Sequence, residues 1–134
     1  MSRNKARAAL TQAWKDGGFG LETAYENAKF TPGSAAWAEF WVVFDSTVSA
    51  TLGTHGENET TGFVQVDLYY PLDKGSGDIT TKADAICDYF QLGRSFDYQG
   101  QYVTIQKIDY SPARPDGGRH RLTLTIHFYA RHLR

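Results

Sequence analysis

The sequence predicts an α+β fold in which a mostly antiparallel or mixed β-sheet carries two helices packed on one face, in the order α-β-β-β-α-β-β. Two segments have apolar residues at three- and four-residue spacing, which is typical of amphipathic helices. The other structured segments alternate apolar and polar residues, as half-buried strands do. Helices and strands do not alternate one by one, so a doubly wound parallel sheet is not expected. The length of 134 residues suits a single domain, 1–134.

The first predicted helix covers residues 3–14, and a short strand covers 21–25. Alanine, the strongest helix former, is frequent in the helix. The pair Gly17-Gly18 ends it, because glycine adopts the left-handed conformation at a helix end at little cost. The residues of its apolar stripe are Ala6, Ala9, Leu10, Ala13 and Trp14.

Two long strands are predicted over residues 37–48 and 62–70. Both are rich in aromatic and β-branched residues, and in both the apolar side chains alternate with more polar ones. The connection between them, TLGTHGENETTG, is glycine-rich and polar, which indicates a loop or a hairpin tip.

A second helix follows Pro71, with Asp78 as its N-cap and Gly93 after its end. The carboxylate of Asp78 can accept the free N–H groups of a first turn. Ile79, Ala83, Ile86 and Phe90 form the apolar stripe of this helix.

Further strands are predicted over residues 96–98, 102–110 and 121–130, and SPARPDGGRH is expected to be a loop. The buried core is expected between the sheet and the helices. Its predicted members are Phe40, Phe44, Val64, Val66, Leu68, Ile86, Phe90, Leu124, Ile126 and Phe128.

Composition excludes several classes of protein. A chain with 41% hydrophobic residues can build a core, and 22% charged residues with a pI near 6.4 argue against disorder and against ordinary basic nucleic-acid binding. No apolar run reaches the roughly 18 residues of a membrane helix, and no signal peptide is expected. A single cysteine excludes an internal disulfide and a zinc site made of several thiolates.

The sequence contains no convincing catalytic constellation. The glycine-rich segments lack the spacing and the lysine of a phosphate-binding loop. The four histidines lack helical ligand spacing, so structural roles are favoured over a metal site. Cys87 is expected to be a packing residue, and Asp84 with Asp88 a solvated helix face. We therefore expect neither catalysis nor a cofactor nor a metal.

Several motifs together resemble one family of small phage proteins. These motifs are ETAYENAKFTP, with Tyr25, Glu26, Asn27, Phe30 and Pro32; TGFVQVDLYYPLDKGSGD, with Gly62, Val64, Val66, Pro71, Gly75 and Gly77; and the closing GGRHRLTLTIHFYAR. Their order and spacing resemble the tail terminators of long-tailed, siphovirus-like phages and prophages. YYPLDKG departs from that pattern, because the family more often has a plainer apolar pair before its proline. The resemblance covers most of the chain from residue 21 onward.

The resemblance implies a structural protein of the virion tail that is assembled in the cytoplasm of the bacterial host. Such a protein forms a homo-oligomeric ring, usually a hexamer, on the finished tail tube. Its partners would be the tail tube protein and the head-completion protein, with DNA only passing through the channel and no membrane. In this reading Asn27 bonds to the backbone of a turn, and Pro32 sets the angle into the long strand.

Charge is segregated along the chain. Residues 1–15, 16–90 and 91–134 carry net charges of +4, −9 and +4, which together give the overall −1. A head-to-tail ring contact can use such complementary segments. The same segments can instead pair within one subunit, and the sequence leaves both possibilities open.

Two polar loops are the candidate assembly sites. Residues 53–60 and 112–118 are expected to be the most mobile parts of an isolated subunit, with at least one of them becoming ordered on assembly. The candidate contact residues are Gly53, His55, Glu57, Glu59, Arg114, Asp116 and Arg119. The alternatives are another head–tail junction or tail tube protein, or a small ligand-binding or enzymatic α+β domain.

Overall fold

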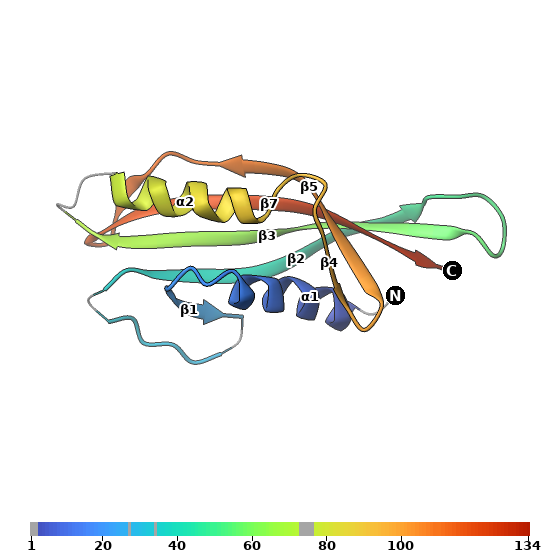
Figure 1. The fold of residues 1–134 in the computed structure, drawn as a ribbon, viewed down its shortest axis with the longest axis horizontal. Coiled ribbons are helices and arrows are strands. Elements are labelled where there is room, and N and C mark those ends of the chain that lie inside the picture. Colours follow the sequence, from blue (N-terminus) through green and yellow to red (C-terminus); the bar gives the residue numbers. More distant parts are fainter. Residues whose placement is uncertain (1–2, 27, 34, 73–76) are drawn as a thin grey trace.

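The computed structural model describes residues 3–26, 28–33, 35–72 and 77–134, and it confirms the α+β class and the predicted order of elements (Figure 1). One short strand, β6, joins the predicted set. The elements are α1 (Arg3–Asp16), β1 (Glu22–Tyr25), β2 (Trp37–Ser49), β3 (Glu57–Pro71), α2 (Gly77–Tyr89), β4 (Ser95–Tyr98), β5 (Gln101–Tyr110), β6 (Arg114–Asp116) and β7 (Arg119–Leu133).

The strands form one mixed sheet in the order β1-β2-β3-β7-β5-β4, with β6 paired to β7. β1 runs parallel to β2, and the other pairs are antiparallel. β3 and β7 pair along their whole length, from Glu57 opposite Leu133 to Pro71 opposite Arg119. At about 3.3 Å per residue this ladder is about 45 Å long, so the two ends of the sheet are well separated.

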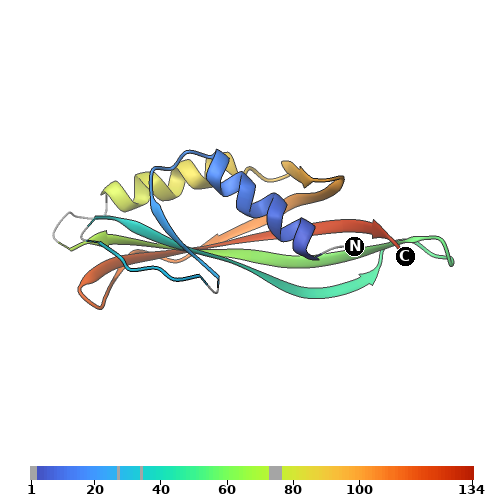
Figure 2. The same ribbon diagram turned by 90° about the horizontal axis from the view of Figure 1, so that it is seen from below.

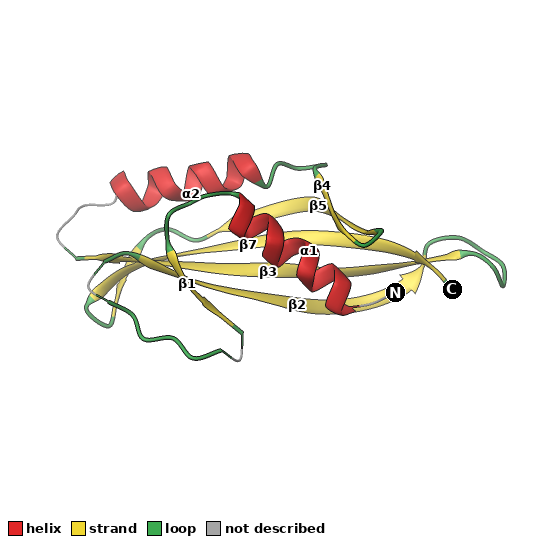
Figure 3. Cartoon of the chain, turned by 60° about the horizontal axis from the view of Figure 1, so that its bottom comes forward, coloured by secondary structure: helices red, strands yellow, loops and turns green. Residues whose placement is uncertain are grey.

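Both helices lie on the same face of the sheet (Figures 2 and 3). α1 packs on the β1–β2 side, where the Trp14 ring lies 5.3 Å from Phe40 and its Nε1 donates to Thr23 Oγ1 at 3.0 Å. α2 packs over β3 and β7, and the hairpin of β4 and β5 folds against α1. In the described part of the chain, no helix covers the opposite face of the sheet.

The buried core agrees with the predicted one in all members but one. Phe44 is half-buried, with its ring edge-on to Phe128 at 5.8 Å and the guanidinium of Arg7 over it at 5.5 Å. It lies beside the first turns of α1, where it lines an open hollow with Arg3, Asn4 and Arg7. The helical stripe of α1 is buried as predicted, and Val103 and Ile105 add β5 to the core.

Several predicted boundaries are wrong. β3 begins at Glu57 rather than Gly62, and hydroxyl pairs such as Thr47 with Thr60 at 2.7 Å extend the hairpin through a polar sequence. The expected loop 111–120 contains β6 and the start of β7. Asp78 lies inside the first turn of α2, where its charge still suits the positive helix end. Asn27 and Gly75 lie outside the described residues.

Candidate assembly surfaces

One end of the sheet extends beyond the helices as an arm, which is defined here as residues 45–61 with 129–134 (Figure 1). The distal half of β2 is exposed on both faces, in contrast to its buried proximal half. A bulge at Asp45 separates the two halves. The arm therefore adds mainly surface, although Thr60 and Ala130 are buried within it.

Arg134 organises the tip of the arm. Its Nη1 donates to the carbonyl of Glu57 at 2.9 Å and to Asn58 Oδ1 at 3.0 Å, and its Nη2 donates to the carbonyls of Thr51, at 2.8 Å, and Gly53. Its backbone N–H adds a bond to the Gly56 carbonyl at 3.1 Å. One guanidinium thus satisfies carbonyls that the loop would otherwise leave to water.

The candidate residues of this end have different surroundings. Glu59 and Glu57 lie 3.3 and 3.9 Å from the guanidinium of Arg131, so β3 and β7 hold them in cross-strand ion pairs. Gly53 and His55 are exposed at the tip. Beside them Leu52 is 96% exposed, and the sequence prediction did not include it.

The other candidate residues lie at the opposite end of the sheet, in the hairpin of β6 and β7. Arg119 donates to the carbonyl of Ala35 at 2.7 Å and to that of Gly33, so it ties the β1–β2 connection to β7. Asp116 accepts from Arg121 at 2.9 Å. Arg114 is exposed and donates to Ser111 Oγ at 3.2 Å.

A buried carboxylate lies on the helix-free face of the sheet. Asp67 is 0% exposed, accepts from Thr123 Oγ1 and from Gln65 Nε2, and lies 3.2 Å from Arg121 Nη2. Arg121 bridges this carboxylate to Asp116. Paired and hydrogen-bonded in this way, a charge can be buried without the full desolvation cost.

An aromatic row on the same face continues from this ion pair. The Phe30 and Trp37 rings are 5.2 Å apart, Trp37 stacks on Tyr69 at 4.3 Å, and Arg121 lies over Tyr69 at 5.4 Å. Burial, a hydrogen bond to Glu39 and the charge of that carboxylate raise the pKa of Tyr69. The sequence placed Tyr69 on the more polar face, and stacking explains how that face is partly closed without a helix.

The described side chains of these surfaces give little support for a catalytic role. Thr60 Oγ1 lies 3.1 Å from His132 Nε2, but Thr60 is 2% exposed and cannot meet a substrate. Burial, Asp84 and Asp88 raise the pKa of Cys87, which disfavours the thiolate. Within the described residues no three His, Cys, Asp or Glu side chains are arranged to hold a metal ion. None of the described helices combines the length and apolar character needed to cross a membrane.

Sequence reasoning missed Arg134, Arg121 and Asp67, which fix the two ends of the sheet. Their partners are distant in the sequence, and only the strand register brings Asp67 opposite Thr123. The alternation of β3 did show Asp67 on the side away from the core, but nothing in the sequence marked it as buried.

The fold is that of an α+β protein with an extended, strongly polar sheet and helices on one face. A family model described as phage tail terminator protein matches residues 4–128, and the chain belongs to this family. No curated protein sequence matches the chain. A solved structure whose title states no function aligns with 97% of this chain and 96% of its own, with a TM-score of 0.79 and 20% identity. At that identity the likeness shows the fold alone.

Proposed function

We propose that this protein is the terminator of a phage or prophage tail: it caps the finished tail tube as a homo-oligomeric ring, of six copies as the resemblance implies, and stops tube growth. The match to the tail terminator family over residues 4–128 carries the proposal. The role is structural and needs neither catalysis nor a cofactor. The chain acts as one domain, is assembled in the cytoplasm of the host, and becomes part of the virion tail.

The two ends of the sheet suit the two contacts that this role requires. A terminator must bind the tail tube protein on one side and the head-completion protein on the other, while DNA passes through its channel. The arm tip presents Leu52, Gly53 and His55, and the opposite end presents Arg114. Because the β3–β7 ladder separates these ends, one subunit can serve both partners at once.

Deletion of the gene tests the function. Without the protein, tails should grow to irregular and excessive lengths and should fail to join heads, as electron microscopy of lysates would show. Supply of the wild-type chain from a plasmid should restore one uniform length. Tails of normal length joined to full heads in the deletion strain would contradict the proposal. A gene for a tail tube protein immediately downstream would add independent support.

A further inference from the structure

Both side edges of the arm lack a strand partner in the described part of the chain. β1 pairs with β2 only over residues 37–40, so residues 46–49, called here the β2 edge, pair with β3 alone. β5 pairs with β7 no further than Tyr129, so residues 130–133, called here the β7 edge, likewise pair with β3 alone. The arm is therefore a ribbon of β2, β3 and β7 with two bare edges.

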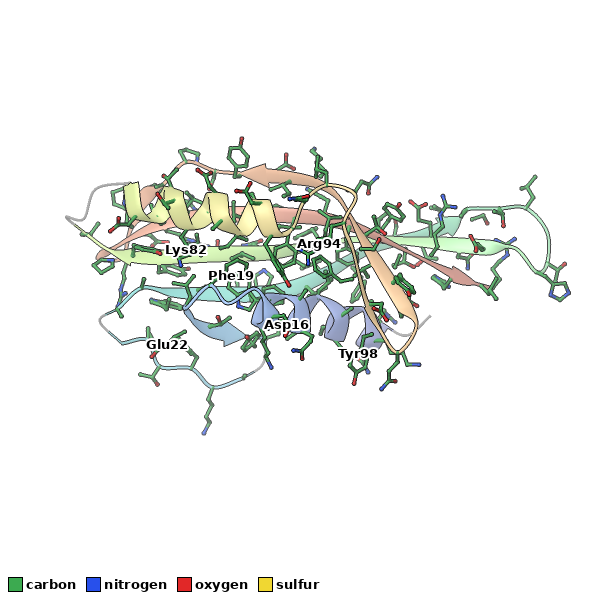
Figure 4. All side chains as sticks on the ribbon, in the orientation of Figure 1. Asp16, Phe19, Glu22, Lys82, Arg94 and Tyr98 are labelled. Carbon is green, nitrogen blue, oxygen red and sulfur yellow. The ribbon has the colours of Figure 1, made fainter. Side chains whose placement is uncertain are left out.

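The β7 edge is bare because the hairpin of β4 and β5 turns away from it. A bulge between Ile105 and Lys107 bends β5, and the hairpin then contacts α1. Figure 4 shows Tyr98, the last residue of β4, beside α1. An open hollow between the hairpin and the β7 edge is lined by residues 99–101 and 131–133, with Lys5 and Glu57. The β7 edge thus faces open space, and another strand can reach it.

On the β2 edge, the backbone groups of alternate residues point away from β3. The N–H of Ala50 donates to the carbonyl of Glu57 in β3 at 2.8 Å. Successive residues of a strand turn these groups to opposite sides, so Thr47 and Ser49 turn theirs outward. The side chains agree, because the hydroxyls of Thr47 and Thr60 are 2.7 Å apart, as suits a close pair that exchanges no backbone bonds.

The β7 edge follows the same rule. The N–H of Arg134 donates to the Gly56 carbonyl at 3.1 Å, on the β3 side, so Arg131 and Leu133 turn their backbone groups outward. The side chain of Gln101 reaches the outward carbonyl of Arg131 at 3.4 Å. Each edge therefore offers the donors and acceptors of two residues to a further strand.

The chain protects a neighbouring part of β2 but not the β2 edge. Beside β1, the carboxylate of Glu26 accepts the N–H of Val42. Residues 46–49 are all exposed and contain neither proline nor lysine, two residues that natural proteins place on free edges. Open donors and acceptors on such an edge are a template for a strand of another chain.

The two edges differ in charge. Asp45 is the one charged residue in the range 41–52, and it forms no ion pair within the described chain. Arg131 of the β7 edge pairs with Glu59, whereas the neighbouring Arg134 donates to uncharged carbonyl and amide oxygens. The β7 edge therefore keeps positive charge, which suits the Asp45 carboxylate of another copy.

We propose that the β2 edge of one copy pairs with the β7 edge of the next copy, which is the contact that closes the ring. This inference rests on the proposed function and names the surface that function uses. β2 and β7 are both antiparallel to β3, so they run in one direction. Rotation about an axis along the arm keeps that direction, so the new pair is parallel. Two different patches meet in it, as a closed ring requires.

One register fits the side chains of both edges. Thr47 and His132 face the helix side, where they line one hollow beside α1. Their neighbours Val48 and Leu133 therefore face the other side. They are 56% and 72% exposed, and a register with Val48 opposite Leu133 covers both. In that register the backbone groups of Thr47 bond to those of Arg131 and Leu133.

Repeated around the ring, this pairing joins all arms into a closed barrel, which leaves no free edge. Each arm contributes β2, β3 and β7. With the six copies that the resemblance implies, the barrel has about 18 strands, a size that leaves an open channel. One contact thus gives both closure of the ring and a central passage.

A designed disulfide tests the pairing. In a Cys87→Ala background, Val48→Cys/Leu133→Cys places two thiols on opposite edges of one arm, with β3 between them. They are then at least about 9 Å apart within a chain, which is too far for a bridge. Oxidation of the assembled protein should link each copy to the next and give a ladder of oligomers on a non-reducing gel. The matched control, Val43→Cys/Leu133→Cys, uses the same face of β2 outside the β2 edge and should give no ladder.

Proline on the β2 edge tests the same contact independently. Ser49→Pro removes an outward N–H and places a ring in the path of the next copy, while the bonds to β3 remain. The concentration for half-assembly should rise about tenfold or more by mass photometry, since one hydrogen bond alone is worth up to about that factor. The dilute variant should unfold at nearly the wild-type temperature. The control Ser49→Ala keeps the N–H and should assemble like wild type.

The outcomes separate this inference from the proposed function. Wild-type rings together with a Val48→Cys/Leu133→Cys variant that assembles but forms no ladder, or with a Ser49→Pro variant that assembles as readily as wild type, would overturn the inference and leave the proposed function standing. A wild-type chain that never associates, alone or on tail tubes, would overturn the inference and the proposed ring together.

Discussion

At the residue scale, Asp67 and Arg121 show how polar groups can stabilise the helix-free face of a sheet. Asp67 is fully buried on the face opposite the described helices, because Thr123, Gln65 and Arg121 surround its carboxylate. Arg121 in turn lies over Tyr69. A charge in this position is stabilising only while its partners remain, so the cost of removing one partner is high.

Replacement of Asp67 by Asn should therefore destabilise the fold. Breaking a buried ion pair costs about 3–5 kcal/mol, and we expect about 3 kcal/mol here because Arg121 keeps Asp116 and some solvent contact. Urea unfolding measures the effect. The matched control is Asp116→Asn, which removes the other carboxylate from the same guanidinium at a partly exposed position and should cost less than about 1 kcal/mol. Equal losses in the two variants would show that Asp67 is not a buried ionic anchor.

At the element scale, Gly62 of β3 leaves no room for a side chain beside β2. A Cβ atom there would lie 2.3 Å from the carbonyl oxygen of Val43 and 2.9 Å from the Phe128 ring. The bulge at Asp45 begins directly opposite, between Phe44 and Ser46. Glycine is thus required where the sheet leaves the core and becomes the arm.

Gly62→Ala should accordingly be costly despite the strand's preference for residues larger than glycine. Overpacking costs about 1–3 kcal/mol and more when backbone is the obstacle, so we expect a loss of at least about 2 kcal/mol. Gly77→Ala in α2 is a suitable control, since nothing lies within 4 Å of its added Cβ, and it should be neutral or stabilising. Thermal unfolding of both variants decides the point, and equal melting temperatures would refute the steric argument.

Elements with a regular spacing of apolar residues could be predicted from the sequence. Strand segments that form only by pairing with a neighbouring strand could not. The stripes of α1 and α2 and the apolar alternation of β7 depend on local spacing, so the sequence predicts their type. The first residues of β3 are polar, and they become strand only because β2 and β7 pair on either side. β6 likewise exists only through its ladder with β7.

At the scale of the whole molecule, the candidate contact residues fall into two groups that are far apart. Sequence reasoning grouped the two polar loops by composition, and the β3–β7 register places them at opposite ends. It did not reveal that Arg134 organises one loop and Arg119 the other end, because those bonds span more than 70 residues. The expected mobility of the loops stays a prediction. Residues 57–60 of the first predicted loop belong to β3, so the loop itself covers residues 50–56.

Substitutions at the two ends should affect different steps of assembly. Leu52→Asp at the arm tip and Arg114→Glu at the opposite end change exposed side chains, so both variants should fold and form rings. In complementation of the deletion strain, one should give overlong tails and the other tails of normal length that lack heads. Electron microscopy separates these outcomes. Failure of both variants at the same assembly step would contradict separate roles for the two ends of the sheet.

The full-length pairing of β3 with β7 has a consequence for folding kinetics. β3 is synthesised long before β7, with α2, β4 and β5 between them, so one edge of β3 has no partner until β7 leaves the ribosome. Sheets built from such distant pairs fold in milliseconds to seconds rather than microseconds. During that interval the apolar side of β2 and β3 is open to wrong partners. A newly made subunit should depend on chaperones more than a helical protein of equal size.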